Sequence, residues 1–167
     1  LKSKGYDTIA MHPYNASGWD RDKVYPLLGF DTFYSLKDWV NPVKIRKYVS
    51  DQSCYDKIIE LYEQKDANTP FFLFNVTMQN HSSYSEEYDN FHPDITVEGT
   101  RSKILPNYLS LIKLSDQALE NLIEYFSQAD EDTIIVFFGD HQPSNSVAAP
   151  VWKINGRSGD SLTEEEE

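Results

Sequence analysis

The chain has 167 residues, of which 40% are hydrophobic and 14% aromatic, and this supports one domain with a buried core. Its 27 acidic and 15 basic residues give a formal net charge of -12, which should repel nucleic acid and bare anionic membranes. The single cysteine, Cys54, excludes an internal disulfide and a cysteine-cluster zinc site, and no run of about 18 apolar residues that could span a membrane is present.

The first segment predicts a strand that ends at a histidine. The first five residues are typical of a helix end closed by a glycine, so the chain is expected to begin part-way through a fold. Residues 6–11 are a short apolar strand that runs into His12. The loop beyond it carries Trp19 and Arg21. This tryptophan either contacts a ligand or pins the loop to the core with the arginine paired to an aspartate, and the residues alone leave both interpretations open.

The next elements alternate between helices and strands. A short helix should begin at Asp20 or Asp22 and be closed by Gly29, and a short strand is expected at residues 32–34. Residues 50–65 are predicted to form an amphipathic helix, because apolar residues recur at helical spacing. Its expected buried face consists of Tyr55, Ile58, Ile59 and Tyr62.

A second histidine follows a second buried strand. Residues 71–76 are apolar and aromatic, and His81 comes five residues later. Residues 82–99 are polar and predict a long surface loop, in which His92 should be exposed. The longest helix is expected from about residue 102 or 106 to residue 128, with a stripe of leucine and isoleucine facing the core.

The stretch from Thr133 to Pro143 contains the strongest motif. Residues 134–138 form a continuous apolar run that suits a strand buried on both faces, and Asp140 and His141 follow directly after a glycine. A carboxylate beside an imidazole is a good ligand pair for a divalent metal. The alternative is that Asp140 caps a turn and His141 is merely exposed.

Three predicted strands thus end near His12, His81 and His141. Strands that alternate with helices predict an α/β fold, with a mostly parallel sheet and helices on both faces. Because ligands bind beyond the carboxyl ends of such strands, the histidines are expected at one functional rim. Residues 1–150 should form this domain, and residues 151–167 a polar, flexible tail.

Three segments carry a family resemblance. They are His12 followed by Trp-Asp-Arg-Asp at residues 19–22, the strand that ends in Gln-Asn-His81, and Phe-Phe-Gly-Asp-His-Gln-Pro at residues 137–143. In order and spacing they resemble the sulfatase-like domain of the lipoteichoic acid synthase and phosphoglycerol transferase family, in the alkaline phosphatase superfamily. The resemblance covers nearly all of the chain and implies the C-terminal portion of an incomplete catalytic domain.

The resemblance also implies an activity and a site. Such an enzyme is membrane-anchored, with an extracellular domain that holds a divalent metal, often manganese, although magnesium, calcium or zinc would also suit. A threonine attacks the phosphodiester of a phosphatidylglycerol-type lipid, and the glycerol phosphate passes to a polymer or glycan. Carried onto this chain, the metal ligands are Asp140 and His141, the catalytic residue is His81, which also contacts the phosphate, and the other substrate-binding residues are His12, Trp19 and Arg21.

Other parts of the family pattern are absent from these residues. The nucleophilic threonine and the acidic metal ligand are expected in a missing N-terminal half, so the chain alone is expected to be inactive. The sulfatase signature Cys-x-Pro-x-Arg is absent, since Tyr-Asp-Lys follows Cys54. Two alternatives stay open: a sulfatase or phosphodiesterase that transfers to water, and a degenerate domain that only binds an anionic glycan.

Overall fold

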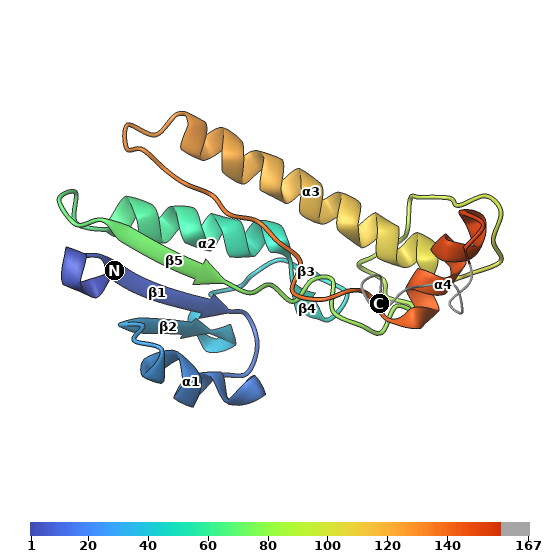
Figure 1. The fold of residues 1–167 in the computed structure, drawn as a ribbon, viewed down its shortest axis with the longest axis horizontal. Coiled ribbons are helices and arrows are strands. Elements are labelled where there is room, and N and C mark those ends of the chain that lie inside the picture. The colour runs from blue at the N-terminus through green and yellow to red at the C-terminus, as the bar shows by residue number, and fades with distance from the viewer. Residues whose placement is uncertain (158–167) are drawn as a thin grey trace.

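The computed structural model describes residues 1–157 and shows an α/β fold built on a three-stranded parallel sheet (Figure 1). Strand β1 (Asp7–His12) lies between β2 (Thr32–Ser35) and β5 (Phe71–Asn75). In register, Ile9 is opposite the first residue of β2, and Asp7 opposite the first residue of β5. The strands expected at residues 6–11, 32–34 and 71–76 are confirmed, with ends shifted by one residue.

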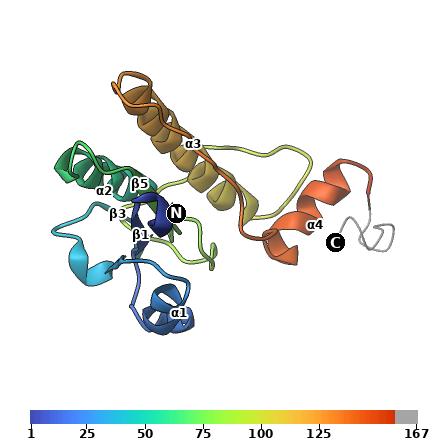
Figure 2. The same ribbon diagram turned by 60° about the vertical axis from the view of Figure 1, so that its left-hand side comes forward.

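The two faces of the sheet are covered by different helices. Side chains alternate along β1, so that Ile9 and Met11 face the core formed with α2 (Asp51–Gln64) and α3 (Leu105–Ser127). On the other face, aromatic rings of β2 and β5 pack around Tyr25 of α1 (Arg21–Leu27). Figures 1 and 2 show α1 and α2 on opposite sides of the strands, which confirms helices on both faces.

Helices α2 and α3 lie side by side and form most of the apolar core. The predicted face of α2 is confirmed for Tyr55 and Ile58, which are buried against Ala118 and Leu122 of α3. Helix α2 begins as expected, because the Ser50 side chain accepts a hydrogen bond from the Ser53 N–H.

The remaining elements are short. Three 3-10 helices cover Lys2–Lys4, Gly18–Asp20 and Leu36–Asp38, and the first ends as expected at a glycine with left-handed backbone, φ 77°. A small antiparallel hairpin pairs β3 (Lys44–Ile45) with β4 (Tyr48–Val49) and had no counterpart in the prediction. No helix in residues 1–157 is long and apolar enough to cross a bilayer.

The predicted strand at residues 134–138 is wrong for this structure. The segment runs back alongside α3 without joining the sheet (Figures 1 and 2), and all five side chains are exposed, Ile134 by 90%. An apolar sequence shows only that a segment can be buried. To form a central strand it must also pair with a neighbouring strand and have other elements packed on both of its faces. Within the described residues this segment has neither.

The end of the described chain is helical. Helix α4 (Asn145–Ile154) extends past the boundary expected at residue 150, and its Val147 is buried in a second apolar cluster with Leu105 and Leu111 of α3. The expected flexible end at residues 158–167 lies outside the described residues.

Candidate functional site

His12, at the last position of β1, is fully buried and has two defined partners. Its Nδ1 lies 3.0 Å from the carbonyl oxygen of Val76, and its Nε2 lies 2.7 Å from Nη1 of Arg21. A carbonyl can only accept and a guanidinium can only donate, so the ring is neutral with its hydrogen on Nδ1. Burial lowers the pKa of His12 to about 4, and the positive charge of Arg21 acts in the same direction.

Arg21 is held between buried groups at the start of α1. Its Nε donates to the Tyr25 hydroxyl at 3.0 Å, and its guanidinium carbon lies 4.6 Å from the centre of the Trp19 ring. The alternative in which Arg21 pairs with an aspartate is not what the structure shows, because Asp20 pairs with Lys23 instead. The fork is thus oriented by His12 and Tyr25.

Trp19 is exposed rather than pinned to the core. Its side chain is 57% exposed, and both Trp19 and Asp20 have left-handed backbone, with φ of 54° and 53°. Left-handed backbone at residues other than glycine is unfavourable and concentrates at functional sites. The strained turn presents the indole ring to solvent beside Arg21.

His81 completes the cluster from the loop after β5. Its ring centre lies 6.0 Å from that of Trp19 and 5.8 Å from that of Tyr48. Tyr14 lies 5.7 Å from Trp19 and 6.5 Å from Tyr48, measured between ring centres, so aromatic rings from the segment after β1, from β4 and from the loop after β5 gather at the site. The structure therefore brings together His12, Trp19, Arg21 and His81, which were predicted separately.

Sequence reasoning missed the two tyrosines of this cluster. Tyr14 lies in a turn-rich loop and Tyr48 in a hairpin of four strand residues, where neither helical nor alternating spacing marks a residue as functional. Tyr14 could have been suspected from its position two residues after His12.

Asp140 and His141 make no described hydrogen bond or ring contact with this cluster in residues 1–157, although Asp140 lies near enough to Tyr84, in the loop that carries His81, to act on its charge. Their side chains are 74% and 75% exposed, and the His141 N–H donates to Oδ1 of Asp140 at 3.0 Å. This is the turn-capping arrangement weighed as the alternative to metal binding. The donor types suit a divalent cation, but residues 1–157 contain no group of three or more His, Cys, Asp or Glu side chains that could hold one. The described residues alone thus do not complete a metal site.

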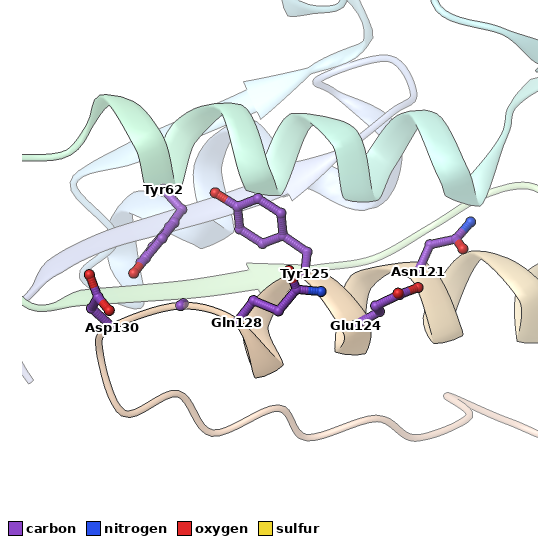
Figure 3. Close-up of a pocket in the computed structure, with 7 residues that line it drawn as sticks. Tyr62, Asn121, Glu124, Tyr125, Gln128 and Asp130 are labelled. Atoms are coloured by element: carbon purple, nitrogen blue, oxygen red, sulfur yellow. The ribbon is translucent and has the colours of Figure 1, made fainter.

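One described pocket lies elsewhere. It has a volume of about 560 Å³ and lies between the C-terminal ends of α2 and α3 (Figure 3), near the start of β5 rather than its carboxyl end (Figure 1). Tyr62 and Tyr125 line it together with the acidic Glu124 and Asp130. Its acidic lining is unsuited to an anionic substrate.

Comparisons with known proteins identify the family of the chain. The Sulfatase family model matches residues 1–158. A capsular polysaccharide biosynthesis protein, RkpI of Rhizobium meliloti, is 30% identical over 86% of this chain and 25% of its own length. The chain spans about a quarter of the length of the curated relatives it matches first.

Two solved structures share the fold. The phosphoglycerol transferase GacH of Streptococcus pyogenes, in complex with sn-glycerol-1-phosphate, matches with a TM-score of 0.67 and 28% identity, over 86% of this chain and 40% of its own. The lipoteichoic acid synthase LtaP of Listeria monocytogenes matches with a TM-score of 0.66 and 26% identity, over 76% and 31%. The chain therefore belongs to the sulfatase family of the alkaline phosphatase superfamily, and its relatives include lipoteichoic acid synthases and phosphoglycerol transferases.

Proposed function

We propose that this chain supplies the phosphate-binding side of a metal-dependent phosphoglycerol transferase. The enzyme would take glycerol phosphate from a phosphatidylglycerol-type lipid and pass it to a cell-envelope polymer or glycan. The observation that carries the proposal is the convergence of Arg21, His12, Trp19 and His81 at the carboxyl ends of β1 and β5. GacH, a similar structure, is in complex with sn-glycerol-1-phosphate.

Arg21 is the side chain best suited to hold the phosphate. His12 and Tyr25 each take one of its N–H groups, and no other hydrogen bond or ion pair in residues 1–157 occupies the rest of the fork. A guanidinium fixed in this way can donate two parallel hydrogen bonds to phosphate oxygens. His12 therefore acts as the group that orients Arg21, while the exposed Trp19 face offers apolar surface to the glycerol carbons.

His81 is proposed as the catalytic residue, because its exposed imidazole can donate to or accept from a phosphate or acceptor oxygen. Asp140 and His141 are proposed as two metal ligands. The other ligands and the nucleophilic threonine would come from a region of the full-length protein that corresponds to the part of its relatives not covered by this chain. When bound, a divalent ion such as manganese would polarise the phosphoryl group. The site would face outward from the cell membrane.

The proposal is tested by glycerol phosphate transfer in the full-length protein with manganese present. Arg21→Lys should lower turnover by about tenfold or more, because lysine cannot form the bidentate contact. Arg101→Lys is the control, since Arg101 is exposed and far along the chain from the site. Release of free glycerol phosphate to water would instead identify a hydrolase, and binding without turnover would identify a non-catalytic domain; either result would reject the transferase.

A further inference from the structure

Arg46 lies directly behind the loop that carries His81. It occupies the turn between β3 and β4, with a left-handed backbone at φ 56°, and only 4% of it is exposed. Its guanidinium donates to three carbonyl oxygens of the loop after β5. These belong to Gln79 at 2.7 Å, His81 at 2.7 Å and Ser83 at 2.5 Å.

The charge of this buried guanidinium has no carboxylate in direct contact. No ion pair in residues 1–157 includes Arg46, and its Nε has no hydrogen-bond partner, although the Glu86 carboxylate lies near enough to act on its charge. The faces of Tyr84 and Tyr48 lie 5.4 Å and 5.8 Å from its central carbon and supply only partial compensation. Burying a cation without a carboxylate in direct contact is costly, and the three carbonyl oxygens, the tyrosine faces and the nearby Glu86 offset part of that cost.

The loop depends on these bonds for its shape. The His81 ring has a hydrogen bond of 3.1 Å between Nδ1 and the carbonyl of the adjacent Ser82, a longer contact of 3.4 Å to the Tyr48 hydroxyl, and contacts with the Trp19 and Tyr48 rings. Because the nearer hydrogen-bond partner belongs to the same loop, the position of the ring depends on the backbone of that loop, which Arg46 holds in place. A second anchor fixes the turn, because Asn90 donates to the carbonyls of Lys44 and Arg46 at 3.0 Å each.

We infer that Arg46 is a positioning residue of the anion site. Its fork of donors fixes the loop so that His81 faces Trp19, and its positive charge, which no carboxylate contacts directly, adds to that of Arg21 in favour of a bound phosphate group. Arginine suits the first task because its rigid fork donates from two separate nitrogens, Nη1 and Nη2, whereas a lysine ammonium has all three of its donors on one nitrogen. The inference rests on the proposed function, since it requires an anion at this cluster.

The experiment measures binding of sn-glycerol-1-phosphate to the full-length protein by calorimetry, and follows the ring signals of His81 by NMR. Arg46→Lys keeps the charge but loses the bridge, so affinity should fall about tenfold. The phosphate-induced change in the His81 signals should also shrink, which a loss of stability alone would not produce. Asn90→Ala, which loosens the turn without touching the guanidinium, should weaken binding in the same direction, and it carries the test if Arg46→Lys does not fold.

Two controls separate the possible failures. Arg101→Lys should bind like the wild type, and the signals of the exposed His92 should not respond to phosphate in any variant. If the wild type binds no glycerol phosphate, the proposed function fails and the inference fails with it. If the wild type binds but Arg46→Lys and Asn90→Ala bind equally well with unchanged His81 signals, the role of Arg46 alone is overturned.

Discussion

At the scale of single residues, the site is defined by which nitrogen of His12 carries a hydrogen. The Val76 carbonyl requires a donor at Nδ1, and Arg21 requires an acceptor at Nε2. A proton added at Nε2 would face the guanidinium and break this bond. The neutral His12 ring thus links the Val76 carbonyl to Arg21 and orients the guanidinium. Protonation of the ring at low pH should break its hydrogen bond with Arg21.

The first prediction concerns acid stability. His12 has a pKa of about 4 in the folded chain against 6.5 unfolded, so the unfolded state binds more protons between these values. The free energy of unfolding should therefore fall as pH drops from 6.5 towards 4, by about 3 kcal/mol from this residue. His12→Asn, which keeps a donor and an acceptor but does not titrate, should lose less stability over that range. Urea denaturation at several pH values measures the free energy of unfolding of both proteins. If that free energy changed with pH to the same extent in the wild type and in His12→Asn, the prediction would be contradicted.

At the scale of elements, a buried polar network joins α2, α3 and the loop after β5. Asp51 donates its N–H to the Gln79 side chain at 3.0 Å and accepts from the Ser115 hydroxyl at 2.5 Å. Ser115 in turn accepts from Gln79 at 3.1 Å and Asn80 at 2.7 Å. The network fixes Gln79 and Asn80, just before His81 in the loop after β5, and Arg46 holds the carbonyls of Gln79, His81 and Ser83 in the same loop.

A second prediction follows from the burial of Asp51, which raises the pKa of its carboxyl above 3.8, while Oδ1 has no hydrogen-bond partner. Because the folded state holds this proton more tightly, the carboxyl costs stability as pH rises above 3.8, and the cost persists at neutral pH. Asp51→Asn removes that titration. Relative to the wild type, its free energy of unfolding should increase as pH rises from 3.8 and then level off once the Asp51 carboxyl is ionised in the folded state as well. A difference between the two proteins that stays constant with pH would show that Asp51 is not destabilised by ionisation.

The elements also show what sequence could predict. Local spacing was sufficient for the three strands and for α2 and α3, because each buries an apolar face at its natural period. The site residues His12 and His81 were predictable because parallel strands place their carboxyl ends at one edge. Arg46 was not, since its importance comes from three carbonyl groups more than thirty residues away along the chain. The prediction of a strand at residues 134–138 was wrong for the opposite reason. The local apolar pattern was strong, but no described strand pairs with this segment.

At the scale of the whole molecule, residues 134–138 form an apolar segment that is left exposed to solvent in the described chain. Phe137 and Phe138 are 62% and 63% exposed, and the outer edge of β5 has no strand partner in residues 1–157. An uncovered apolar run beside an open sheet edge favours association between copies.

The third prediction is that the 167-residue chain self-associates through this segment. Val136→Lys, at a side chain 76% exposed, should shift the chain towards monomer, because a charge opposes burial of the segment. Leu27→Lys is the matched control, since Leu27 is 86% exposed on α1, on the other face of the sheet. Sedimentation velocity over a range of concentrations measures the effect. An equal shift in both variants would point to net charge rather than to this segment.

The exposed Trp19 has a spectroscopic consequence. Its indole ring centre lies 5.5 Å from that of His12 and 6.0 Å from that of His81, and a protonated imidazole at such range quenches indole emission. The pKa of His12, about 4, keeps that ring neutral near physiological pH, so His12 does not quench Trp19 there. With the other two tryptophans, Trp39 and Trp152, replaced by phenylalanine, the fluorescence of this chain would come from Trp19 alone and would report directly on a ligand that covers its exposed indole ring.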